Sequence, residues 1–279
     1  MGGGVSESEA GWVRDFELFL RRRERYVYYV VSIALFLLAW EFGSRAIVSN
    51  LLPGIVPVGT EMAEILRTGV FFTHLFDTLG RVAVGFALAY GISVPLGIAM
   101  GWDHRAEYFF DIPILIGISV PGLAVAIVAI IWFGLSELAA YSSVFILATP
   151  MIVFNFWQGT KDIDADLVRM GESFDVSRFN LVRHIVLPSL LPYLLAAARF
   201  GLAISWKIVV IVELLGLTSG VGYQINRQFQ LYSITGVFAW TLTFTLVMMT
   251  IEFGVLKTLE KRVTRWRGEA AVGGGGVRE

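Results

Sequence analysis

Long apolar runs separated by short polar stretches dominate this chain. A bilayer core about 30 Å thick is crossed by roughly 20 apolar helical residues, so run length indicates which segments could span it. The segments that meet this length are residues 26–48, 78–100, 109–133, 138–157, 189–215 and 234–256. The pattern therefore predicts an all-α membrane protein with about six transmembrane helices.

Proline is expected to bend one of these segments, and glycine is expected to allow close packing of another. The third contains Pro113 and Pro121, and we expect it to form a short helix, a kink at Pro121 and then a spanning part. In the second, small residues allow the backbones of neighbouring helices to approach closely. The glycines expected to pack in this way are Gly80, Gly85, Gly91 and Gly97.

The distribution of lysine and arginine predicts the orientation. With the N-terminus inside, the inner segments hold about sixteen cations and the outer segments about four, and cytoplasmic flanks carry the excess. The outer cations are Arg45, Arg67, Arg81 and Arg227. We therefore expect a cytoplasmic N-terminal segment, 1–25, a transmembrane permease domain, 26–260, and a cytoplasmic C-terminal tail, 261–279. An acidic polar stretch precedes the first apolar run, which is unlike a cleaved signal peptide.

Two connections are too long for simple turns. The outer one, residues 50–77, contains a stretch from Glu61 to Gly69 that could form an amphipathic surface helix. The inner one, residues 159–188, has apolar positions at three- and four-residue spacing, which predicts an amphipathic helix. Its apolar positions are Ile163, Leu167, Met170 and Phe174. Such a stripe must lie against the bundle or against a partner.

The composition of the chain excludes several kinds of partner and site. The chain is 56% hydrophobic and 16% charged, with a net charge of −1 and no cysteine, so we expect no nucleic-acid partner, disulfide or thiolate metal site. The three histidines are far apart in sequence, and no metal site is expected. There is no G-x-x-x-x-G-K-[ST] phosphate loop and no catalytic constellation. The chain is therefore expected to be no enzyme and to bind no cofactor itself.

Charged and aromatic residues recur inside the fifth apolar segment. Arg199, Trp206 and Glu213 are seven residues apart and share a helix face. Because charges within a span normally face protein or water, we predict that this face lines a translocation path. The alternative is that Arg199 and Glu213 satisfy helix ends or backbone carbonyls. Roughly 21 Å separates the two along the helix, so we expect different partners for each, and Lys207 points about 80° away from Arg199.

The inner loop carries a recognisable run. Residues 166–178, DLVRMGESFDVSR, are followed by RHIVLPSLLP at residues 183–192. Together they resemble the cytoplasmic loop of ABC importer permeases, written E-A-A, three residues, G, nine residues, I-x-L-P. Counting back from Pro188 places the family's glycine at Asp175 and its triplet at residues 169–171.

This resemblance implies a short coupling helix that docks on a separate ATPase. The residues it assigns to docking are Asp166, Leu167, Arg169, Met170, Gly171, Phe174, Asp175, Ile185, Leu187 and Pro188. Aspartate tolerates the left-handed conformation that a glycine would adopt after the helix. Arg169 stands where the family has glutamate and so reverses a charge on the docking surface.

Three further motifs resemble the nitrate, sulfonate and taurine branch of these permeases. They are TLGRVAVGF at 78–86, IWFGLSE at 131–137, and ELL at 213–215 followed by SGVGY at 219–223. Their order and spacing extend the similarity over about residues 75–257. The resemblance implies the type I ABC importer permease fold.

It also implies partners and a location. The partners would be ABC ATPase subunits that bind ATP and magnesium, an extracytoplasmic solute-binding protein, a second permease subunit as a homodimer, and the lipid of the plasma (inner) membrane. Nitrate, sulfonates, taurine, bicarbonate and aromatic or vitamin precursors remain open as solutes. The alternative is a stand-alone ion-coupled carrier, but such carriers usually have paired broken helices in repeats, and only the third segment here is clearly broken.

Overall fold

Helices account for nearly all of the protein that the structure describes. The computed structural model describes residues 7–46 and 51–256, and no strand occurs among them. The predicted all-α class is therefore confirmed. The predicted tail, 261–279, lies outside the described residues. The chain divides into two compact units, residues 1–61 and 62–279, which are described separately.

The first unit is built on α1, Glu7–Ala46, whose residues 26–46 form the first membrane-span candidate. The apolar side chains at the start of this candidate are exposed, as a lipid-facing helix requires. At its end, the Trp40 indole donates to the Pro53 carbonyl at 2.9 Å. The next helix, α2, Ile55–Arg67, begins before the amphipathic helix expected at Glu61, so that predicted boundary was wrong.

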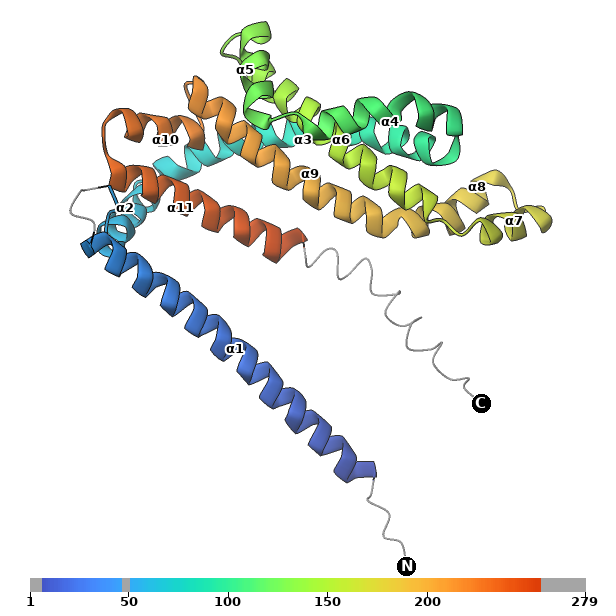
Figure 1. Ribbon diagram of the computed structural model, residues 1–279, viewed down its shortest axis with the longest axis horizontal. Helices are drawn as coiled ribbons and strands as arrows, with labels where there is room; N and C mark the ends of the chain where they lie inside the picture. The colour runs from blue at the N-terminus through green and yellow to red at the C-terminus, as the bar shows by residue number, and fades with distance from the viewer. Residues whose placement is uncertain (1–6, 47–50, 257–279) are drawn as a thin grey trace, which may run out of the picture. The chain divides into compact units, whose positions relative to one another are not determined.

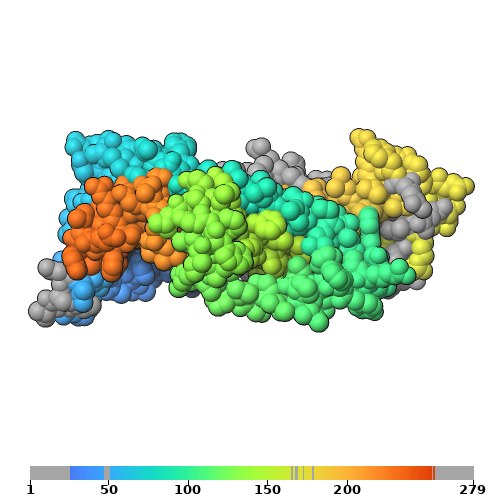
Figure 2. All heavy atoms as spheres, turned by 90° about the horizontal axis from the view of Figure 1, so that it is seen from above, coloured from blue at the N-terminus to red at the C-terminus, as the bar shows by residue number. Residues whose placement is uncertain are grey.

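The second unit is a bundle of long helices. Its elements are α3, Val70–Trp102; α4, His104–Ser119; α5, Gly122–Phe133; α6, Glu137–Lys161; α7, Ala165–Ser173; α8, Arg178–Leu181; a π-helical turn η1, Val182–Val186; α9, Leu187–Leu215; α10, Val221–Gln230; α11, Ile234–Thr250; and η2, Ile251–Leu256. In Figure 1, α3, α6 and α9 form the body of the bundle, with α10 near one end and α7 and α8 at the other. The view in Figure 2 places the same segments at opposite ends.

Four described helices are long and apolar enough to cross a membrane, and a bent pair makes a fifth. The pair is α4 and α5, which meet at 99° across the break before Gly122. The expected kink at Pro121 is confirmed, whereas Pro113 lies inside α4 without interrupting it. The sixth apolar segment contains α11, which at 17 residues is shorter than each of the four single-helix span candidates.

Two helix boundaries also differ from the expected ones. The second span begins at Val70 rather than Thr78, because the preceding residues continue the helical pattern. The fifth belongs to a helical stretch that starts at Phe179. The predicted inner loop is therefore helical from Phe179 onward and leads through the π-helical turn η1 into α9, so Pro188, the second residue of α9, follows a helical turn and not a free helix start.

The core lies where α3, α5, α6 and α9 meet, around small and branched apolar side chains. A Cβ on Gly85 would lie 2.7 Å from Val144, and one on Gly97 would overlap Phe156. These two glycines thus allow α3 to approach α6 closely, as expected. For Gly80 and Gly91 no neighbour lies within 4 Å in the described part of the chain, so their packing role stays a prediction.

Candidate functional site: a buried ion cluster and a coupling segment

The α10 end of the bundle contains a buried ion cluster centred on Arg81 of α3. Arg81 Nη1 donates to Glu213 Oε1 of α9 at 2.6 Å. Its Nε and Nη2 donate to the two carboxylate oxygens of Glu137 at the start of α6, each at 2.7 Å. Ser219 accepts the remaining two bonds, through its carbonyl and its hydroxyl, both at 2.8 Å. All five guanidinium N–H groups are therefore used.

The Glu213 carboxylate is completely buried, with 0% exposure, beside an Arg81 that is 5% exposed. The Thr78 hydroxyl donates to it at 2.9 Å, and the Gly222 amide donates to Oε2 at 2.9 Å. Thr78 in turn accepts from the Val221 amide at 2.9 Å. A buried carboxylate is stable only when it is paired and hydrogen-bonded in this way.

Glycines let the backbone between α9 and α10 wrap around this carboxylate. Gly220 has φ +105°, a conformation that side chains rarely adopt, and a Cβ there would overlap the Glu213 carboxylate. A Cβ on Gly222 would overlap the Val210 carbonyl. The two glycines of the SGVGY motif are thus required by close approach and, at Gly220, by backbone conformation.

Each of the three sequence motifs described above contributes residues to this cluster. Thr78 and Arg81 come from TLGRVAVGF, Glu137 from IWFGLSE, and Glu213 and Ser219 from the ELL and SGVGY pair. We expected Glu213 to line a path and Arg81 to be an outer cation, and we assigned no role to Glu137. The missed signal was a charge of each sign at the edge of an apolar run, where a partner is expected.

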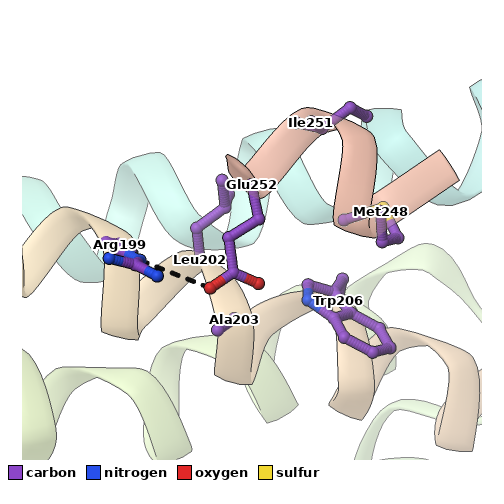
Figure 3. A pocket seen from close by; sticks show the side chains of 7 residues that line it. All are labelled: Arg199, Leu202, Ala203, Trp206, Met248, Ile251 and Glu252. Atoms are coloured by element: carbon purple, nitrogen blue, oxygen red, sulfur yellow. Dashed lines mark hydrogen bonds and ion pairs between the residues drawn. The ribbon is translucent and has the colours of Figure 1, made fainter. Parts of the chain in front are cut away.

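A second ion pair lies farther along α9. Arg199 Nε is 3.3 Å from Glu252 Oε1 of η2, and both side chains are about one-third exposed, at 32% and 29%. Figure 3 shows the two residues in the wall of a small pocket that also includes Trp206. The structure thus brings Arg199 and Trp206 into one pocket and Glu213 into the buried cluster. The expectation that Arg199 and Glu213 have different partners is confirmed.

The segment between α6 and α9 is well defined by contacts of its own. The Asp164 carboxylate accepts from the Asp166 amide at 2.8 Å, just inside the first turn of α7. After α7, Asp175 has φ +50°, and the Val176 amide donates to the Gly171 carbonyl at 3.1 Å. This is a Schellman-type end with a left-handed residue. The expected backbone conformation of Asp175 is therefore confirmed.

Gly171 allows α7 to pack closely against the later part of the same segment. It is buried, and a Cβ there would lie 3.3 Å from Leu181 and 3.4 Å from Ile185. At the entrance to the segment, Tyr193 of α9 packs on Gly159 and donates its hydroxyl to Asp162 Oδ2 at 2.6 Å. The segment is thus tied to α9, as a rigid element would be.

Several large apolar side chains of the segment are exposed. Phe174 is 75% exposed and Met170 is 52% exposed, and Leu187 is exposed as well. Asp166 and Arg169 are exposed and form a loose pair at 3.7 Å, while Ile185 and Pro188 are half-buried. Leu167 belongs to α7, but its side chain lies outside the described part of the chain. Of the predicted stripe, Met170 and Phe174 are therefore exposed, whereas Ile163 is half-buried.

An all-helical bundle with several apolar helices long enough to cross a bilayer is the architecture of a multi-pass membrane protein. Residues 93–265, more than half of the chain, match the family described as binding-protein-dependent transport system inner membrane component. The chain belongs to this family, whose members are multi-pass permease subunits of ABC importers.

Curated relatives and solved structures agree with this assignment. The chain is 30% identical to the putative aliphatic sulfonates transport permease protein SsuC of Bacillus subtilis, over 88% of this chain and 90% of that protein. It is 28% identical to the taurine transport system permease protein TauC of Escherichia coli, over 70% and 71%. These relatives place it in the nitrate, sulfonate and taurine branch.

The fold also matches a solved transporter. A chain of the MetNI methionine ABC transporter in an inward-facing conformation superposes with a TM-score of 0.59 at 19% identity, over 68% of this chain and 94% of that chain. This similarity establishes the type I importer permease fold for the present chain.

Proposed function

We propose that residues 159–188 dock on a separate ABC ATPase and transmit its movements to the bundle. The observation that carries this proposal is a pair of exposed apolar side chains, Met170 on α7 and Phe174 directly after it, on a segment that is tied to α9. An exposed apolar patch on an anchored helix is the expected form of a protein interface. The ATPase would bind ATP and magnesium, since this chain has no phosphate loop.

The assembly that fits this role contains two copies of this chain, two ATPase subunits and an extracytoplasmic binding protein. Family membership and the fold support this arrangement. Both termini would lie in the cytoplasm, with α7 and α8 on the same side, because the inner segments hold the excess of lysine and arginine. The binding protein would deliver solute to the opposite end, near α10.

The solute proposed for this importer is a small organic anion of the sulfonate type. The names of two relatives, which refer to aliphatic sulfonates and to taurine, support this choice. A third relative, the formylaminopyrimidine transport permease ThiX of Halalkalibacterium halodurans, is 27% identical. Butanesulfonate and taurine are accordingly the first solutes to test.

Phe174→Glu tests the docking role directly. The full-length chain is reconstituted in proteoliposomes with its ATPase and binding protein, and ATP-dependent uptake and ATP hydrolysis are measured together. Because an aromatic anchor at an interface contributes about 2 kcal/mol or more, uptake should fall at least about tenfold. Membrane insertion should be unchanged.

Tyr108→Glu is the matched control, since Tyr108 is a similarly exposed aromatic residue on α4 outside the segment. It should retain wild-type uptake. Wild-type uptake by Phe174→Glu would refute the docking assignment. Uptake driven by an ion gradient without ATP would refute the importer function itself.

A further inference from the structure

A second pocket lies beside the break between α4 and α5. It has a volume of about 220 Å³, is open on one side, and is bordered by residues of α4, α5, α6 and α9. Its lining is apolar except for one cation, Lys207 of α9, which is exposed. The lining residues are Gly117, Ile118, Gly122, Leu147, Met151, Ile204, Lys207, Ile208 and Ile211.

The position of Lys207 requires an explanation. It lies within a candidate membrane span, between apolar positions one turn away on each side, Ile204 and Ile211. Ionised residues inside spans are costly and normally face a partner or a water-filled space. No carboxylate in the described residues forms an ion pair with Lys207. Its described neighbour is the Trp206 ring, with Nζ 5.5 Å from the ring centre.

A contact with an aromatic face does not use the N–H groups of an ammonium as a hydrogen bond does. Lys207 therefore retains donors for an anionic group that enters the pocket. The first residue of α5, Gly122, belongs to the same wall, and the partial positive charge of that helix end adds to the charge of the lysine. The remaining wall offers only apolar contact.

We propose that this pocket is a station on the translocation path and that Lys207 binds the anionic group of the solute. The lining defines the ligand class: a small organic anion with one charged group, which meets Lys207, and an apolar part, which meets Ile204, Ile208 and Ile211. This proposal rests on the proposed importer function and specifies its solute site. It assigns to Lys207 a role distinct from that of Arg199, which lines the other pocket.

The absence of cysteine from this chain permits a direct test. Ile118, 40% exposed, lies in the wall of the pocket on α4, so Ile118→Cys places a unique thiol there. Membranes that contain the full-length variant, with and without ATP, are treated with an anionic reagent, methanethiosulfonate ethylsulfonate, or with a cationic one, methanethiosulfonate ethyltrimethylammonium. The ratio of the two labelling rates reports the local preference for anions.

The anionic reagent should react faster relative to the cationic one, and Lys207→Gln should lower this ratio roughly five- to tenfold because a nearby unit charge is lost. Lys207→Arg should retain the ratio. Butanesulfonate should slow labelling in the presence of Lys207, whereas butanol at equal concentration should not. Thr68→Cys, an exposed position outside the pocket, is the control thiol, and its ratio should not respond to Lys207→Gln.

Three results would overturn the assignment. They are a ratio that Lys207→Gln leaves unchanged, protection by butanol equal to that by butanesulfonate, and a thiol at residue 118 that neither reagent reaches with or without ATP. None of these measurements depends on ATP turnover. Failure here would therefore leave the docking role tested by Phe174→Glu intact, and failure of docking would not alter the labelling ratio.

Discussion

Arg81 and Arg199 both lie in long apolar helices, but their surroundings differ. Arg81 is 5% exposed and uses all five N–H groups on Glu137, Glu213 and Ser219. Arg199 is 32% exposed and forms an ion pair with Glu252 at 3.3 Å in a pocket wall. The first cation lies on α3 and contacts α6, α9 and the loop before α10, whereas the second lies at a surface between α9 and η2.

The difference separates a structural charge from one that a solute could reach. A guanidinium with every donor satisfied inside protein has no capacity left for a ligand, so the Arg81 cluster holds α3, α6, α9 and α10 together. A partly exposed pair in a pocket wall can exchange partners at little cost. Of the three residues predicted to line a path, Arg199 and Trp206 occupy such a wall, and their role there stays a prediction, as does that of Glu213.

Arg81→Met breaks the cluster and should have the largest effect. It leaves the fully buried Glu213 charge without its cation, and removal of one member of a buried pair costs about 3–5 kcal/mol. The free energy of unfolding in mixed micelles should fall by this amount. The double variant Arg81→Met with Glu213→Gln should recover part of the loss, because no uncompensated charge remains on α9.

If Arg81→Met lowered stability by less than about 1 kcal/mol, the guanidinium would not be a structural element. A large loss of uptake with full stability would instead mean that the cluster takes part in transport. Either result would remove the distinction between the two arginines.

Gly220→Ala tests the backbone around the same carboxylate and should have an intermediate effect. At φ +105°, a side chain is strained, and its Cβ would overlap Glu213. A loss of about 1–3 kcal/mol in unfolding free energy is expected. Gly80→Ala is the control: it lies in α3 with open space beside it and should be neutral or stabilising by up to about 1 kcal/mol. Equal effects for the two variants would show that the close approach at Gly220 is unimportant.

Apolar run length identified the spans because burial in lipid constrains every residue of a spanning helix. The same reasoning placed the bend at Pro121, where the ring prevents a continuous helix. It could not distinguish Gly85, which faces Val144, from Gly91, which faces open space. Periodicity within one helix does not reveal which helix lies opposite.

The candidate sites were predictable to different degrees. The conformation of Asp175 could be expected because the family resemblance places it where a glycine ends the helix, and aspartate tolerates the same left-handed backbone. The convergence of Arg81, Glu137 and Glu213 did not, because these residues come from three segments more than 50 residues apart in sequence. Only the packing of α3, α6 and α9 brings their side chains together.

Arg199→Gln is expected to have the smallest effect on stability and thereby sharpens the comparison. Polar contacts between membrane helices contribute about 0.6 kcal/mol on average, and Glu252 keeps partial access to its surroundings once its partner is lost. The unfolding free energy should therefore change by less than about 1 kcal/mol.

If Arg199 lines the path, uptake of butanesulfonate by the reconstituted importer should fall even though stability is retained. Glu252→Gln is the companion variant, since it breaks the same pair but leaves the cation in the wall. Loss of uptake in Arg199→Gln alone would indicate that the cation itself matters, whereas equal losses in both variants would indicate that the pair is needed to hold α9 against η2.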